Sequence, residues 1–262
     1  MMTAAGKFPG VDESGVGDAV RAWFRSAPGR LLLEQEHALL EQQLPDLFGY
    51  YLVQLGFLGE VPEAVLAARI RERLVIDVDG PVPGAVIPVS AHSTRLPIRT
   101  DSVDAVLLTH TLDFAADPHQ VLREVDRILI PEGRLILTGF NSLSLWGLRR
   151  LWPPSRRRIP WNARFIGALR IQDWLGLLGF EIELTQYLMF CPPLRREGMM
   201  RRLAFLDRLG ARCSLPLGGA YLIRAVKRVA RLTPIEPAWR SKKPSLLRGR
   251  AVEPTTRARA VD

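Results

Sequence analysis

Three short apolar runs in the first half of the chain end in residues that could bind a nucleotide-type cofactor. The run at 50–55 is followed by Gly56, the run at 74–79 contains Asp77 and Asp79 near its end, and the run that begins at 104 reaches His110. Glycine lets backbone N–H groups approach a ligand closely, and a carboxylate can accept hydrogen bonds from ribose hydroxyls. Histidine titrates near neutral pH and can exchange a proton with a substrate. The pattern therefore indicates cofactor binding beside a possible proton-transfer group.

The apolar runs alternate with amphipathic segments, as strands alternate with helices in a parallel sheet covered on both faces. In such a sheet, ligands bind outside the carboxyl ends of the strands, where the loops after the first strands meet. The sequence therefore predicts an α/β protein whose cofactor site lies at that edge. Strands are predicted at 50–55, 74–79, 85–90, 133–140 and 218–229, and residues 104–112 predict a buried strand that runs into a loop. Helices are predicted at 61–73 and 117–129, and residues 171–190 predict a helix followed by a strand.

The periodicity also suggests how the chain is organised. Residues 1–48 predict helices that pack on the core, interrupted at Pro28-Gly29. A single domain is expected at 49–230, with an insertion at about 141–168 that mixes tryptophan, arginine and proline. Residues 231–262 lose periodicity and gain proline and basic residues, so a disordered basic tail is expected there.

Composition excludes several classes of protein. The two cysteines, Cys191 and Cys213, form no CxxC pair, which argues against a disulfide framework or a cysteine zinc site, and no other metal-ligand cluster is visible. The apolar runs are too short to cross a bilayer, and a cytoplasmic protein is expected. The formal net charge of +9 would attract RNA, an anionic membrane surface or an acidic substrate.

Residues 96–140 carry a more specific pattern that extends over more than one motif. A Leu-Pro pair, a short acidic turn, a buried strand, a loop with histidine and acid, an Asp-Pro helix start and a Pro-x-Gly turn into a strand follow in order. This segment resembles the class I S-adenosylmethionine-dependent methyltransferases, in particular their small type 11 methyltransferase domain. A weaker resemblance extends from Tyr50 to Lys227. It implies a Rossmann-like fold, mostly parallel with an antiparallel last strand, and S-adenosylmethionine as cofactor.

The first loop departs from that family. The family pattern is an acid followed by three alternating glycines, and laid on this chain it places Gln54 at the acid and keeps Gly56. Leu58 and Glu60 replace the other two glycines, while Gly59 is displaced by one residue. Glutamine can accept a hydrogen bond but lacks the charge that would complement the cofactor's ammonium group. Gln54, Gly56 and Gly59 are the expected cofactor contacts of this degenerate loop.

The resemblance implies roles for residues after the next three strands. Either Asp77 or Asp79 would bind the ribose: spacing favours Asp77, whereas position at the strand end favours Asp79, and an Asp-Gly turn is the alternative for both. His92 falls where the family binds adenine. Thr109 would line the cofactor after the fourth strand, and His110 would lie near the methyl acceptor as the candidate catalytic residue.

Three functions remain open on sequence alone. The favoured one is an S-adenosylmethionine-dependent methyltransferase acting on a small-molecule or lipid-like acceptor, with the 141–168 insertion serving as a lid. The second is a non-catalytic binding or scaffold protein whose cofactor site has decayed. The third is an RNA-binding or RNA-modifying protein, prompted by arginines and tryptophans at 149–161 but unsupported by a nucleic-acid-binding motif.

Overall fold

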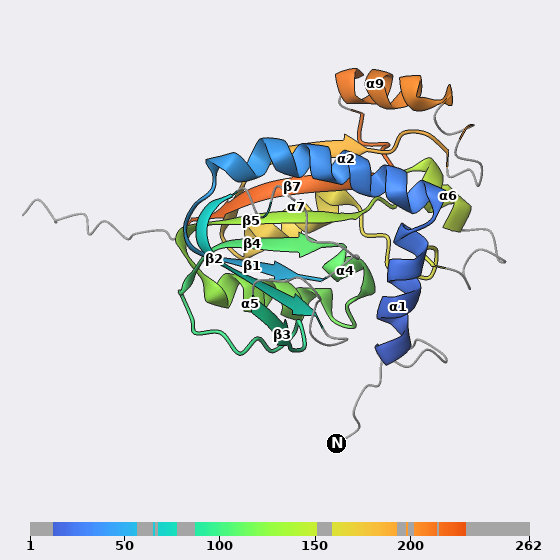
Figure 1. Cartoon of the computed structure of the whole chain (residues 1–262). Helices are drawn as coiled ribbons and strands as arrows, with labels where there is room; N and C mark the ends of the chain where they lie inside the picture. The colour runs from blue at the N-terminus through green and yellow to red at the C-terminus, as the bar shows by residue number, and fades with distance from the viewer. Residues whose placement is uncertain are drawn as a thin grey trace, which may run out of the picture. The chain divides into compact units, whose positions relative to one another are not determined.

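The structure is a computed structural model and is described here for most residues between 13 and 228 (Figure 1). Residues Met1–Val229 form one compact unit, so the N-terminal helices belong to the same unit as the sheet. The predicted tail at 231–262, Gly59 and Asp79 all lie outside the described residues. The described residues are 13–56, 65, 68–77, 87–150, 159–192, 198, 202–213 and 215–228.

A seven-stranded sheet forms the centre of the unit, in the order β3-β2-β1-β4-β5-β7-β6. Every neighbouring pair from β3 to β5 is parallel, whereas β7 runs antiparallel to both β5 and β6. The predicted class I methyltransferase topology is confirmed. The strands are β1 (Phe48–Leu55), β2 (Arg69–Asp77), β3 (Ile87–Ser90), β4 (Val103–Thr109), β5 (Leu129–Phe140), β6 (Phe180–Leu188) and β7 (Ala220–Lys227).

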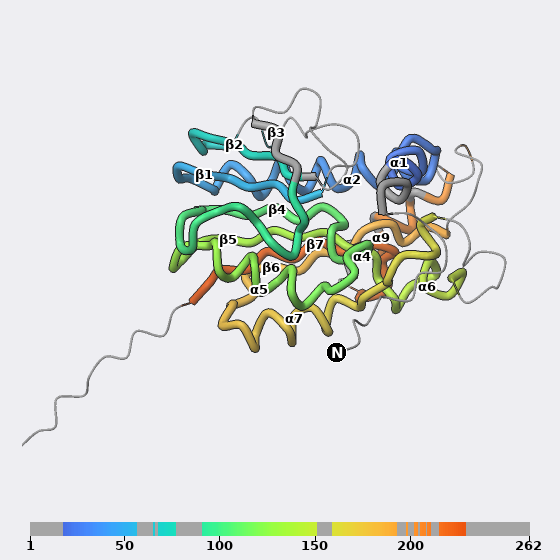
Figure 2. The backbone as a smooth tube through the Cα atoms, turned by 90° about the horizontal axis from the view of Figure 1, so that it is seen from below, coloured from blue at the N-terminus to red at the C-terminus, as the bar shows by residue number. Residues whose placement is uncertain are grey.

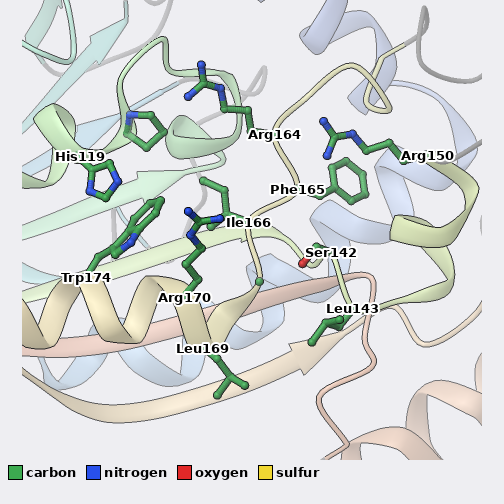
Figure 3. Close-up of a pocket in the computed structure, with 12 residues that line it drawn as sticks. His119, Ser142, Leu143, Arg150, Arg164, Phe165, Ile166, Leu169, Arg170 and Trp174 are labelled. Atoms are coloured by element: carbon green, nitrogen blue, oxygen red, sulfur yellow. The ribbon is translucent and has the colours of Figure 1, made fainter.

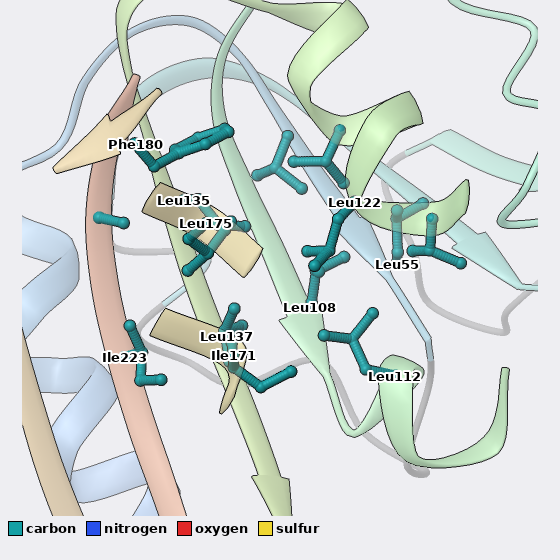
Figure 4. Close-up of a cluster of buried hydrophobic side chains, with 14 of the residues drawn as sticks. Leu55, Leu108, Leu112, Leu122, Leu135, Leu137, Ile171, Leu175, Phe180 and Ile223 are labelled. Atoms are coloured by element: carbon teal, nitrogen blue, oxygen red, sulfur yellow. The ribbon is translucent and has the colours of Figure 1, made fainter. Parts of the chain in front are cut away.

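Helices cover both faces of the sheet, as predicted (Figures 1 and 2). Because side chains alternate along a strand, Val106 and Leu108 of β4 point to one face and Leu107 points to the other. The first face packs against α5 and α7 (Figure 4), and the second packs against α2. The helices are α1 (Glu13–Phe24), α2 (Ala27–Gln43), η1 (Leu44–Asp46), α4 (Thr111–Phe114), α5 (Pro118–Ile128), α6 (Leu145–Arg150), α7 (Ala168–Leu177) and α9 (Ala204–Cys213).

Two local predictions were wrong. The helix expected at 61–73 cannot include Arg69–Arg73, because these residues form the first half of β2 and pair in parallel with β1. The N-terminal break lies at Arg25–Ser26 rather than at Pro28-Gly29. Pro28 fits the first turn of α2, where its missing N–H has no intrahelical acceptor to lose.

An aromatic cluster closes the sheet beyond the carboxyl end of β5. Phe140 ends β5 and lies 5.8 Å from Trp23 of α1 and 4.9 Å from Phe165, measured between ring centroids. The indole of Trp146 is fully buried and donates to the carbonyl of Cys191. The N-terminal helices and the segment after β5 are thereby fixed over the edge at which ligands of such sheets bind. Among the helices that the structure describes, none is both long and apolar enough to cross a membrane.

Candidate functional site

Gly56 forms a tight turn directly after β1. Its φ of +82° lies in the left-handed region, and a Cβ built there would stand 2.8 Å from both the Thr109 carbonyl oxygen and Thr111 Oγ1. The hydroxyl of Thr111 donates to the Leu55 carbonyl, and that of Thr109 donates to the Gly56 carbonyl. The ends of β1 and β4 are therefore in direct contact, and only glycine fits between them.

Replacing Gly56 with alanine is expected to lower the free energy of unfolding by about 2–3 kcal/mol, because a left-handed backbone is strained and the new Cβ clashes with backbone. Urea denaturation measures this change. The matched control is Gly176→Ala on α7, where no atom lies within 4 Å of the added carbon. That substitution should leave stability unchanged or raise it. Equal behaviour of the two variants would contradict the role given to Gly56.

Gln54 is buried at the end of β1, with 1% of its surface exposed. Its amide nitrogen donates to the Gly56 carbonyl at 3.3 Å, while Oε1 has no hydrogen-bond partner among the described residues. Because a buried acceptor without a donor costs free energy, such an atom in a native site commonly receives a donor from a ligand or water. An ammonium group, such as that of S-adenosylmethionine, would supply the missing donor.

For two other predicted cofactor contacts, Asp77 and His92, the structure gives the position in the fold. Asp77 ends β2 beside the turn, and the Ile76 carbonyl before it accepts from the Gly56 N–H. His92 is exposed in the loop after β3, and its carbonyl accepts from the Arg95 N–H. The strands that carry Gln54, Asp77 and Thr109 are adjacent in the sheet, so their carboxyl ends meet at one edge.

His110 lies in a buried cluster with two acids. Its Nε2 is 2.8 Å from Glu36 Oε1 on α2, and its Nδ1 is 2.8 Å from Asp113 Oδ2 on α4. The Phe140 N–H also donates to Asp113 Oδ2. The imidazole has none of its surface exposed, and its backbone is left-handed, with a φ of +53°. Helix α2, helix α4 and the end of β5 are thus joined by hydrogen bonds beside the end of β4.

The electrostatics of this cluster favour a charged imidazole. Burial alone would lower the pKa of His110, but the charge of Glu36 and the hydrogen bonds to both carboxyl groups outweigh burial and raise the pKa from 6.5 to about 10. Burial raises the pKa of Asp113 from 3.8 to about 6, against the opposing effect of His110. At neutral pH the cluster holds an imidazolium between carboxyl groups.

This arrangement differs from the acid–base role expected of His110. Both ring nitrogens are engaged, and the ring is sealed between Phe24 and Phe140, whose centroids lie 5.3 and 4.3 Å away. The geometry therefore favours a role in positioning the loop after β4. Glu36 was not predicted as a partner of His110, because the two residues lie 74 positions apart in sequence. The signal that could have indicated a buried polar contact is a single acid on the buried face of α2, between Leu32 and Leu40.

Two cavities lie beyond the carboxyl end of β5, against the Phe165 side of the aromatic cluster. The first, called the basic pocket, has a volume of about 530 Å³ (Figure 3). The second, called the apolar groove, lies between α6 and α9 and has a volume of about 730 Å³. Residues of the basic pocket include His119, Arg150, Arg164, Phe165, Arg170 and Trp174. Residues of the apolar groove include Leu143, Leu145, Leu148, Phe190, Leu206 and Leu209.

The two cavities share part of their lining. Ser142, Leu143, Arg150 and Phe165 border both of them. Phe165 also stacks on Phe140, which contacts the His110 ring. Two stacked rings, Phe140 and Phe165, therefore lie between His110, which follows β4, and the cavities. No group of three or more potential metal ligands occurs in the portion of the chain that the structure describes.

Comparison with known proteins agrees with this geometry. Residues 61–137 match the methyltransferase domain family. An uncharacterized protein of Escherichia coli, YafS, is 38% identical over 147 residues, which is 55% of this chain and 59% of that protein. A demethylmenaquinone methyltransferase of Chlamydia pneumoniae is 24% identical over 88 residues, or 34% of each chain. The chain thus spans less than two thirds of the length of these curated relatives.

Solved structures share the fold. An S-adenosylmethionine-dependent methyltransferase from Thermotoga maritima superposes with a TM-score of 0.52 at 24% identity, covering 76% of this chain and 97% of that one. The superposition covers 76% of the chain and therefore extends beyond the family match at residues 61–137. Residues 61–137 therefore match the methyltransferase domain, and the fold around them is that of class I S-adenosylmethionine-dependent methyltransferases.

Proposed function

We propose that the protein transfers a methyl group from S-adenosylmethionine to a small-molecule or lipid-like acceptor. The cofactor would lie at the carboxyl ends of β1, β2 and β4 and supply the methyl group from its sulfonium. The observation that carries the proposal is the buried Gln54 Oε1, which has no donor among the residues that the structure describes and lies at the position where the family places a cofactor-binding acid.

Each predicted cofactor-binding residue would then have one role. Gln54 would accept from the cofactor's ammonium group, and Gly56 would allow the close backbone approach. Thr109 would hold the turn after β1 through its bond to the Gly56 carbonyl. The proposal keeps Gly59 as a second backbone contact and His92 as the residue beside adenine.

The ribose would be bound by Asp77 or Asp79. Because methyl transfer from a sulfonium depends mainly on alignment of donor and acceptor with water excluded, the protein's principal contribution is positioning. The aromatic cluster around Phe140 supports this task at the end of β5. His110 would fix the loop after β4 without exchanging a proton with the acceptor.

Replacing Gln54 with leucine tests the proposal by equilibrium dialysis with radiolabelled S-adenosylmethionine. Affinity should fall about tenfold or more, because a hydrogen bond to a charged donor is lost. The unliganded protein should be as stable as before or more stable, because the unsatisfied buried oxygen is removed. The variants Asp77→Ala and Asp79→Ala identify the ribose acid as the one whose loss weakens binding.

The matched control is Gln186→Leu on β6. Gln186 Oε1 also lacks a partner among the described residues, but Gln186 pairs with β7 away from β1. Its replacement should leave cofactor affinity unchanged. Equal affinity of the Gln54→Leu variant and the unmodified protein would overturn the assignment of Gln54, and absence of binding to both would support a non-catalytic relative.

A further inference from the structure

The basic pocket and the apolar groove differ in chemistry although they share part of their lining. The basic pocket is lined by three arginines, Arg150, Arg164 and Arg170, and Arg150 also donates to the Trp161 carbonyl. Figure 3 shows these arginines arriving from three segments: the end of α6, the loop before α7, and α7 itself. Arg170 also stands over the Trp174 ring at 5.3 Å, which holds its charge beside the pocket. The pocket is therefore suited to an anion.

The apolar groove leaves large hydrophobic side chains in contact with solvent. Leu148 on α6 is 62% exposed and Leu209 on α9 is 57% exposed, and both line the groove. Leu143, Leu145, Leu215 and Leu217 are likewise exposed around it. A contiguous exposed apolar surface of this kind marks a site of interaction, because single scattered residues need no explanation but a concave cluster does.

We infer that the two cavities together bind one amphiphilic acid, with its anionic group in the basic pocket and its apolar chain in the apolar groove. The inference rests on the proposed function, since it names this molecule as the methyl acceptor. Arg150 and Phe165 border both cavities, so the cavities are adjacent, and the proposed molecule would extend across these two side chains.

Size and shape agree with a small amphiphilic ligand. Each volume, about 530 and about 730 Å³, lies within the range of sites for small molecules, about 300–1,000 Å³. A flat bilayer would contact a broad flat or convex surface, whereas both cavities are concave. Contacts from Phe165 through Phe140 to His110 connect the shared part of the lining with the end of β4.

The experiment uses cis-parinaric acid, a fluorescent fatty acid, titrated into the full chain below its micellar concentration. Oleate and oleyl alcohol then compete for the bound probe. The expected result is saturable binding that oleate displaces and that oleyl alcohol displaces at least about fivefold more weakly, because the alcohol lacks the charge. Binding should occur without S-adenosylmethionine, so it is read separately from cofactor binding.

Two pairs of variants assign the parts of the site. Arg170→Gln should weaken probe binding about fivefold, whereas Arg123→Gln on the exposed face of α5 should not change it. Leu148→Glu should weaken binding about tenfold by placing a charge in the groove. Its control is Leu177→Glu at the end of α7, which is 86% exposed and outside both cavities. If Leu148→Glu does not fold, Leu209→Gln replaces it.

The failures of the two proposals are distinguishable. Cofactor binding without probe binding would overturn the amphiphile site and leave the methyltransferase proposal intact. Probe binding that Arg170→Gln and Leu148→Glu do not weaken would place the probe elsewhere and also overturn the inference. Association with phosphatidylglycerol vesicles in the absence of probe binding would assign the groove to a bilayer surface instead. Probe binding without cofactor binding would retain the site and remove its role as an acceptor site.

Discussion

Replacing Glu36 with alanine is expected to lower the free energy of unfolding by about 3–5 kcal/mol. The substitution breaks one of the two ion pairs of a fully buried imidazole and leaves its Nε2–H without its acceptor, while the pair with Asp113 remains. Helix α2 would also lose its polar contact with the loop after β4. Urea denaturation at neutral pH measures the effect.

The conservative variant Glu36→Gln separates charge from hydrogen bonding. Its side-chain oxygen can still accept from the His110 Nε2–H, so the loss should be smaller than that of Glu36→Ala. Glu34→Ala provides the matched control, because Glu34 lies on the exposed face of the same helix and its loss should change stability by less than about 0.5 kcal/mol. A Glu36→Ala variant as stable as Glu34→Ala would show that the cluster does not hold α2 on the domain.

Stability is expected to fall between neutral and alkaline pH because of His110. The pKa of His110 is about 10 in the folded protein against 6.5 for the ordinary side chain, so the folded state binds the proton more tightly. The resulting stabilisation is complete below pH 6.5 and is lost as pH rises through 10. Asp113, with its pKa raised to about 6, acts in the same direction at lower pH, between 3.8 and 6. The slope can reach about 1.4 kcal/mol per pH unit.

The measurement compares the unmodified protein with His110→Asn, since asparagine tolerates the left-handed backbone at this position. Between pH 7 and 9 the unmodified protein should lose about 2 kcal/mol more stability than the variant. If the variant does not fold, Glu36→Gln gives the same information, because without the Glu36 charge the pKa of His110 falls and the slope becomes shallower. Parallel pH profiles would contradict a charged His110 in the folded protein.

The sequence predicted the sheet well because its strands are buried on both faces. The runs 105–108 and 135–137 are entirely apolar, which leaves few alternatives to a central parallel strand. The same reasoning failed at Arg69–Arg73. The residues Arg-Ile-Arg-Glu-Arg include good helix formers, but pairing with β1 decides the conformation. Ile70 is buried in β2, while Arg73 donates to the carbonyls of Val65 and Ala68.

The part of the candidate site that lies at the strand ends could also be predicted from the sequence. Gln54 and Thr109 lie at the ends of β1 and β4, and Gly56 directly follows β1, so their sequence positions imply their positions in space. The partner of His110 comes from a helix that precedes the sheet, and no local pattern encodes that contact. The two cavities depend on α6, α7 and α9, whose approach is set by packing of the aromatic cluster rather than by any motif.

Calorimetric titration of the full chain with S-adenosylmethionine, and separately with S-adenosylhomocysteine, tests the central claim most directly. The proposed function predicts saturable heat with one site per chain for both ligands, because Gln54 and the turn at Gly56 are proposed to contact parts that the two molecules share. ATP, which shares only the adenosine part, should bind far more weakly. No detectable heat with either sulfur ligand at millimolar concentration would contradict the account, since the fold would then be present without its cofactor.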